Sequence, residues 1–196
     1  SGDRVPLRRE LAKLFVAAGW TKVNDVLRRD ENPEWSMVVG LGALNKREDV
    51  SATLGIRSES VQQLHTELRG LENPAYVATV GADYGYVTDG SYKIWAAPQD
   101  AVEDIYDSIL QGLEKLRPFM ALERVSEVYA AIPATEADPS AHYRMVVIEL
   151  LRGRPEAVAE MMLRAEKISC RRDDEICEDF RLFREKSRAR FPQFVR

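Results

Sequence analysis

Histidine and cysteine, the residues that serve most nucleophilic and metal chemistry, are scarce in this sequence. Its 196 residues include two histidines and two cysteines. A Ser-His-acid set needs a histidine, and most transition-metal sites need histidine or cysteine with further ligands at suitable spacing. His65 and His142 have no acidic or cysteine partner at ligand spacing, so we expect surface or boundary residues there. The sequence therefore predicts no catalytic residue, no metal site and no cofactor, and favours a protein that is not an enzyme.

The two cysteines also lack a recognised pattern. Cys170 and Cys177 stand seven positions apart in a charged, helix-like stretch. This spacing matches neither a disulfide framework nor the paired ligands of a zinc site. We therefore expect reduced thiols.

Long hydrophobic runs are missing as well. The longest uninterrupted apolar runs span only a few residues, such as Met145 to Ile148, whereas a membrane-spanning helix needs roughly 20. The first ten residues, SGDRVPLRRE, contain no methionine and no apolar signal core, which indicates a trimmed or tagged start rather than an export sequence. We expect no membrane segment and a cytoplasmic location.

Phosphate-loop and calcium-loop signatures are absent too. Gly40-Leu41-Gly42-Ala43 lacks a third glycine and leads into another predicted strand instead of a helix. The paired carboxylates, such as Glu103 with Asp104, mostly fall at predicted helix starts, where negative charge stabilises the helix dipole. None of them has the spacing of a calcium loop.

Charge is present but unevenly distributed. The chain has a formal net charge of −4, yet residues 181–196 hold six basic residues and one acidic residue. Arg184, Arg188 and Arg190 of this basic tail are candidates for contact with a nucleic acid or an acidic partner. The same pattern is typical of an intramolecular clasp or of a solvated helix face, and both alternatives stay open.

The order of hydrophobic patterns predicts an α+β fold. We expect an antiparallel sheet of about five or six strands, packed against two or three helices, over residues 1–133. Residues 134–138 form a predicted linker, and residues 138–196 a C-terminal appendage of three helices. The individual elements expected in the first domain are helices over 7–18, 60–68, 100–116 and 122–132, and strands over 20–29, 34–43, 49–56, 76–80 and two within 84–95.

Residues 84–95 carry the strongest local signal in this scheme. The dipeptide Asp89-Gly90 stands between two runs of aromatic and β-branched residues, which is typical of a tight β-hairpin. Capping patterns are also expected at two helix starts, with Ser60 followed by Gln63 and Asp100 followed by Glu103.

An aromatic cluster on this predicted hairpin is the leading candidate for a partner-binding surface. With its interleaved acidic residues it consists of Asp83, Tyr84, Tyr86, Asp89, Tyr92 and Trp95. Tyrosine and tryptophan offer rigid contact area with a polar group at one end, which suits protein interfaces. The alternative is that these rings only pack beneath the helices.

The arrangement from Leu7 to Ile132 resembles a bacterial family known as domain of unknown function forty-three-oh-four. The resemblance rests on Gly19-Trp20 after the first helix and on four further motifs. These are Leu27-Arg28-Arg29, Trp35 to Val39, Val50 to Ile56 and Tyr92-Lys93-Ile94-Trp95 before a helix ending at Arg117-Pro118-Phe119. It implies a protein like the immunity proteins that neutralise bacterial toxins by binding them.

A second resemblance concerns the C-terminal helices. Residues 150–157, which include Arg152-Gly153-Arg154-Pro155, are similar to the turn of one tetratricopeptide-type helix pair. Such a pair can serve as a packing cap for the domain. Alternatively, it forms part of a peptide-binding groove, and the protein would then be an adaptor.

These observations favour a cytoplasmic protein-binding module that occludes a partner protein with an acidic, aromatic-bearing surface, and a basic toxin is the candidate partner. The alternative is a small-ligand binder or an enzyme of unknown reaction, with a pocket between sheet and helices lined by Tyr86, Tyr92 or Trp95. Nucleic acid is a less favoured partner, because the sheet region is acidic and contains no RNP-type octamer.

Overall fold

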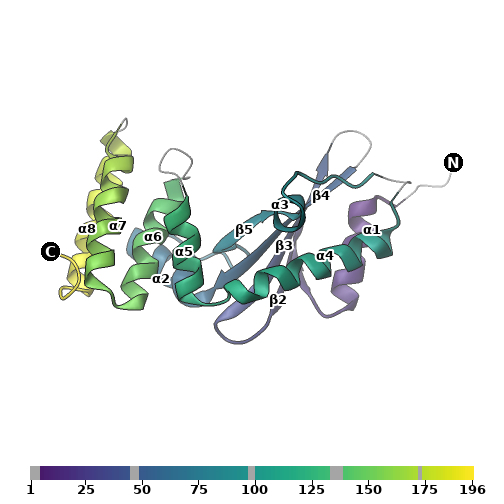
Figure 1. Ribbon diagram of the computed structural model, residues 1–196, viewed down its shortest axis with the longest axis horizontal. Coiled ribbons are helices and arrows are strands. Elements are labelled where there is room, and N and C mark those ends of the chain that lie inside the picture. Colours follow the sequence, from purple (N-terminus) through teal and green to yellow (C-terminus); the bar gives the residue numbers. More distant parts are fainter. Residues whose placement is uncertain (1–4, 45–48, 97–99, 133–138, 172–173) are drawn as a thin grey trace. The chain divides into compact units, whose positions relative to one another are not determined.

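The computed structural model describes residues 5–44, 49–96, 100–132, 139–171 and 174–196 and confirms the α+β class (Figure 1). By its internal contacts the chain divides into two compact units. Residues 1–58 and 75–120 form the first, here called the sheet unit, and residues 59–74 and 121–196 form the second, called the helical unit. The predicted linker at 134–138 lies outside the described residues.

The sheet unit contains one antiparallel sheet of five strands in the order β1-β2-β3-β4-β5. Each strand pairs with its neighbour in sequence, as expected for a meander. The strands are β1 (Thr21–Val23), β2 (Val26–Asp30), β3 (Trp35–Leu44), β4 (Asp49–Ser58) and β5 (Val80–Asp83).

Helices α1 (Leu7–Ala17) and α4 (Val102–Leu116) cover one face of this sheet (Figure 1). Alternate residues of β3 and β4 point to that face, because strand side chains alternate with a period of two. Cross-strand pairs such as Met37 with Ile56 and Val39 with Leu54 are fully buried there. They pack with the buried apolar side of the helices, which includes Leu11, Phe15, Ile105, Ile109 and Leu113.

The remaining elements of the sheet unit are short. Helix α3 (Tyr84–Thr88) follows β5 directly, and the 3-10 helix η1 (Arg117–Phe119) ends α4 where Pro118 cannot continue an α-helix.

The helical unit consists of five helices in its described part. They are α2 (Glu59–Arg69), α5 (Leu122–Ala131), α6 (Pro139–Arg152), α7 (Pro155–Ser169) and α8 (Asp174–Arg190). The predicted three C-terminal helices are confirmed, and α6 and α7 pair across the short turn at Gly153, whose φ of 66° suits glycine. An aromatic cluster of Tyr143, Phe180 and Phe183 is buried where α6 and α8 meet.

The observed division differs from the predicted domain boundary. The helices α2 and α5 group with the C-terminal helices, whereas the sequence pattern assigns both to the sheet domain. Three chain crossings, after residues 58, 74 and 120, connect the two units.

Several local predictions are wrong. Residues 20–29 form a hairpin rather than one strand, because Asn24 adopts φ 53° and turns the chain between β1 and β2. The predicted strand at 76–80 is shifted to Val80–Asp83. Ser60 lies inside α2 rather than before it, because β4 ends at Ser58 and α2 begins at Glu59 without a loop. Asp100 accepts the Ala96 N–H at 2.9 Å instead of capping α4.

The expectation of reduced thiols is also wrong. Cys170 and Cys177 form a disulfide, with their Cα atoms 4.4 Å apart. The bond joins the end of α7 to the first turn of α8. The sequence pattern did not predict this disulfide, because two cysteines seven positions apart in one continuous helix would be too far apart to bond. Here the cysteines belong to the ends of two successive helices, which brings their side chains together.

Candidate protein-binding surface

The segment after β5 forms a short helix in place of the predicted hairpin. Asp83 is the N-cap of α3, and its Oδ1 accepts the N–H groups of Gly85 and Lys93 at 2.8 and 3.1 Å. Asp89 and Gly90 then close the helix, since both donate their N–H groups to the Gly85 carbonyl. The Asp-Gly signal is therefore a helix end rather than a strand turn.

Gly85 fixes how closely this helix approaches the following loop. A Cβ atom at Gly85 would lie 1.7 Å from the Ser91 carbonyl oxygen and 2.8 Å from the Lys93 nitrogen. No side chain fits at such distances, so the contact requires glycine. Together with the Asp83 hydrogen bonds, this packing holds α3 against residues 91–93 and determines where the aromatic residues lie.

The aromatic residues of the predicted site divide into an inner and an outer pair. Trp95 is buried, and its ring centroid lies 4.7 Å from that of Tyr84. Trp95 also pairs with Val50 through two backbone hydrogen bonds, which attaches the loop to β4. Tyr86 and Tyr92 point outward and are 61% and 49% exposed. The structure therefore buries Trp95, leaves Tyr84 half-buried against it, and exposes the other two aromatic residues.

Ile94 joins the outer pair. Its side chain is 43% exposed, which is unusual for isoleucine. We call Tyr86, Tyr92 and Ile94 the tyrosine surface. The predicted site did not include Ile94, although alternation along residues 92–95 predicts that Ile94 shares a face with Tyr92, opposite Trp95.

The charged residues of the predicted site have different roles. Asp83 is occupied by backbone N–H groups and acts as a cap, as described above. Asp89 is exposed, but its Oδ1 accepts from the Ser91 N–H and hydroxyl at 3.1 Å each. Lys93 is exposed beside the tyrosine surface. Both aspartates thus stabilise the loop that carries the tyrosine surface.

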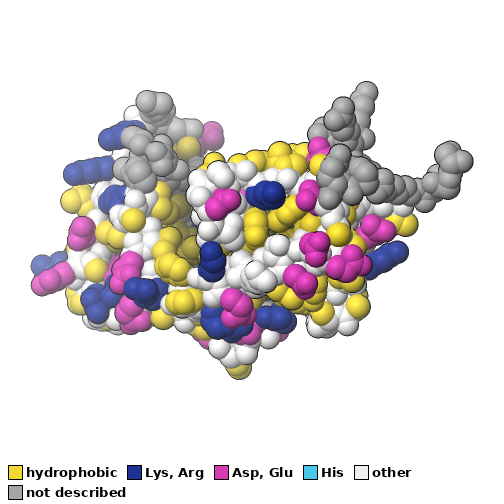
Figure 2. Space-filling model, turned by 45° about the vertical axis from the view of Figure 1, so that its right-hand side comes forward, with side chains coloured by type: hydrophobic (Ala, Val, Ile, Leu, Met, Phe, Trp, Pro, Cys, Tyr) yellow, Lys and Arg dark blue, Asp and Glu magenta, His cyan; other side chains and the backbone are white. Residues whose placement is uncertain are grey.

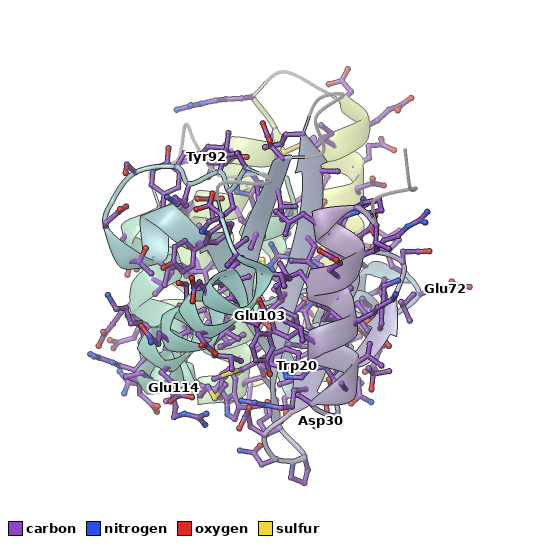
Figure 3. The ribbon with its side chains drawn as sticks, turned by 90° about the vertical axis from the view of Figure 1, so that its right-hand side faces the viewer. Trp20, Asp30, Glu72, Tyr92, Glu103 and Glu114 are labelled. Carbon is purple, nitrogen blue, oxygen red and sulfur yellow. A yellow bond between two sulfur atoms is a disulfide. The ribbon has the colours of Figure 1, made fainter. Side chains whose placement is uncertain are left out.

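Helix α4 adds negative charge to the same unit. It packs against α3, with Gly112 placed where a Cβ would meet Tyr84 at 3.2 Å. Glu103, Asp104 and Asp107 are exposed, and none of them forms an ion pair with another described residue. Figure 2 shows acidic side chains gathered where α4 lies, and Figure 3 shows Tyr92 and Glu103 on the surface of the sheet unit.

The acidic character of α4 ends at its C-terminus. Arg117 donates to both carboxylate oxygens of Glu114 at 2.8 and 2.9 Å, and these hydrogen bonds lower the pKa of the Glu114 carboxyl. Arg117 also reaches Glu31. The free negative charge of α4 is therefore concentrated in its first two turns.

The predicted contacts of the basic tail have partners within the helical unit. Arg184 pairs with Glu166 at 3.0 Å, and Arg190 pairs with Glu67. Arg188 donates to the Arg196 carbonyl at 2.6 Å. This geometry favours the intramolecular clasp among the alternatives for the tail.

The two histidines are buried rather than at the surface. His65 in α2 is 5% exposed, and His142 in α6 is 4% exposed. Their helices pack together, and the His65 ring lies 6.3 Å from that of Tyr143. Among the described residues, no group of His, Cys, Asp and Glu side chains could hold a metal ion.

The space between the sheet and α4 is filled with side chains. Leu54 of β4 packs closely against Gly112 of α4. A Cβ added at Gly112 would lie 2.8 Å from the Cδ1 atom of Leu54. Of the three residues expected to line a pocket there, Trp95 is buried against Tyr84, while Tyr86 and Tyr92 face away from the core. This packing does not favour the ligand-pocket alternative.

Comparison of the chain with protein-family models, with curated proteins and with solved structures finds no match in any of the three. The resemblance to the domain of unknown function therefore stays a prediction. In the described part of the chain, no helix has the length and apolar character needed to cross a membrane.

Proposed function

We propose that this protein is a binding module that occludes a basic partner protein through the tyrosine surface of its sheet unit. The observation that carries the proposal is the exposure of Tyr86 on α3 and of Tyr92 and Ile94 on the loop after it. Asp83 and the buried Trp95 hold these segments in place. A contact surface that is already ordered loses little conformational entropy on binding. Exposed aromatic residues of this kind are enriched at the centres of protein interfaces.

The charge of α4 supports a basic partner. Carboxylates at Glu103, Asp104 and Asp107 would attract a positively charged protein and increase its association rate. The immunity-type role implied by the sequence resemblance is one form of this proposal. A cytoplasmic site of action is a separate prediction, and the Cys170–Cys177 disulfide opposes it, because disulfides persist mainly in oxidising compartments.

Site-specific photo-crosslinking tests the proposal. A benzoyl-phenylalanine introduced in place of Tyr86 should crosslink one partner protein in cells that produce this chain. The same residue in place of Leu163, which is 54% exposed on the helical unit, should not. The double substitution Tyr86→Ser with Tyr92→Ser should then weaken binding of the purified partner by at least about tenfold, as expected for two interface aromatics.

Gly85→Ala provides a second, independent variant. The alanine Cβ at position 85 would collide with the Ser91 carbonyl, so the loop that contains Ser91 must move away from α3. This movement changes the distance between Tyr86 on α3 and Tyr92 on the loop. We expect it to weaken the same binding while the tryptophan fluorescence of the folded sheet unit is retained. The tyrosine surface would be rejected as the binding site if positions 86 and 163 crosslinked equally. It would also be rejected if the double variant bound the partner as tightly as the wild type.

A further inference from the structure

A second surface of the sheet unit has the opposite charge. A groove of about 450 Å³ lies along the outer side of α1, next to the edge strand β1. Its lining consists of three cations and three apolar residues: Arg9, Lys13, Lys22, Ala12, Val16 and Ala17. No carboxylate lines it, although the whole chain carries a net charge of −4.

The helical spacing of these residues creates the groove. Arg9, Lys13 and Ala17 follow one another at intervals of four, and Ala12 and Val16 form the neighbouring row, so cations and apolar side chains share one face. Ala12 and Ala17 are short, whereas the basic side chains around them are long. The centre of the groove is therefore apolar, and its rim is positive.

The three cations are available for a partner. Arg9, Lys13 and Lys22 are exposed, and none of them forms an ion pair with another described residue. By contrast, the neighbouring Arg8 is engaged with Asp25 at 2.9 Å. Val16, at 47% exposure, lies between the cations and would be covered together with them.

We propose that this groove binds an acidic amphipathic segment of a partner protein, with a large apolar side chain seated over Ala12, Val16 and Ala17. Carboxylates on both sides of that side chain would meet Arg9, Lys13 and Lys22. The occupant is a peptide rather than a membrane surface, because membrane-binding helices insert large apolar residues such as Trp, Phe and Leu, whereas the apolar residues here are two alanines and a valine. The groove is separate from the tyrosine surface, and its ligand has the opposite charge.

Titration of the full chain with a synthetic peptide tests this inference. The probe is a helical peptide with two leucines four residues apart, flanked by glutamates. Amide chemical shifts of α1 and β1 should change on binding, and Lys13→Glu with Lys22→Glu should weaken the affinity by at least about tenfold, as expected for two lost charge pairs at a desolvated contact. Lys167→Glu, an exposed lysine of the helical unit, is the matched control and should bind like the wild type.

Peptide controls separate charge from shape. A peptide with serine in place of leucine should bind more weakly, and one with lysine in place of glutamate should bind the charge-reversed variant better than the wild type. Tyr86→Ser should leave this binding unchanged, so the inference can fail or hold independently of the proposed function. Four outcomes would each overturn the inference. Two concern the peptide: chemical-shift changes outside α1 and β1, or equal affinity for the wild type and for the Lys13→Glu with Lys22→Glu variant. The other two are stronger binding to phosphatidylserine vesicles than to the peptide, and self-association of the protein at the groove.

Discussion

The sheet unit and the helical unit use their aromatic and charged residues in different ways. In the helical unit, Tyr143, Phe180 and Phe183 are buried together, and burial raises the pKa of the Tyr143 hydroxyl. Its basic tail is engaged in intramolecular pairs, such as Arg184 with Glu166. In the sheet unit, by contrast, Tyr86 and Tyr92 are exposed.

A part-buried cluster between α5 and α6 strengthens this contrast. Arg152 donates to both oxygens of Glu149 at 3.0 Å and to the Ser126 hydroxyl at 2.7 Å, and Ser126 in turn donates to Glu149. Such a cluster joins the two helices through hydrogen bonds among its own side chains, with Arg152 Nε the one buried nitrogen of that guanidinium that has no partner among the described residues. The difference between the units is that the strongly exposed tyrosines, Tyr86 and Tyr92, lie in the sheet unit, whereas the main aromatic cluster of the helical unit is buried in its core.

The largest expected effect tests whether the helical unit is stabilised on its own. Phe180→Ala removes a fully buried ring between Tyr143 and Phe183, which should lower the free energy of unfolding of that unit by about 4 kcal/mol. All three tryptophans belong to the sheet unit. In a urea titration, far-UV circular dichroism should therefore show an earlier transition, while the tryptophan fluorescence transition stays in place.

The exposed Leu182 on the same helix gives the control, because Leu182→Ala removes a side chain that is 52% exposed and should change neither transition noticeably. If Phe180→Ala moves both transitions together, the two units unfold as one and the comparison between them loses its thermodynamic basis.

A smaller effect is expected from the disulfide. Replacing both Cys170 and Cys177 by serine opens a short loop between α7 and α8, and the chain-entropy model gives a loss of about 2 kcal/mol for a loop of this length. Urea unfolding followed by circular dichroism measures this loss. Dithiothreitol should destabilise the wild-type protein equally and leave the double variant unchanged; free thiols in the oxidised wild type would contradict the pairing.

The main strands and long helices were predictable because their hydrophobic period is regular. The extended segments at 34–43 and 49–56 correspond to β3 and β4, and the helical spacing in α4 correctly indicated buried residues such as Ile105 and Ile109. Turn chemistry was less decisive. Asp89-Gly90 can end a helix as well as a hairpin strand, and the outcome depends on Asp83 and on the close packing at Gly85, which local patterns do not contain.

The candidate surface was only partly predictable for the same reason. The sequence identified the aromatic cluster, but a hairpin model assigns its faces by simple alternation. In the structure, α3 turns Tyr86 outward while Tyr84 contacts Trp95. The groove on α1 was missed, because its residues come from one helix and from a strand that the sequence did not separate from β2.

The smallest expected effect concerns how the tyrosine surface is held in place. Asp83→Ala removes the acceptor for the Gly85 and Lys93 N–H groups, and the loss of a helix N-cap costs about 1 kcal/mol. Hydrogen exchange of these two amides should accelerate about fivefold, since local opening becomes that much more frequent. Asp107→Ala on α4 is the matched control, because its exposed carboxylate caps neither amide. Unchanged exchange at Gly85 and Lys93 would mean that Asp83 does not hold the loop in place.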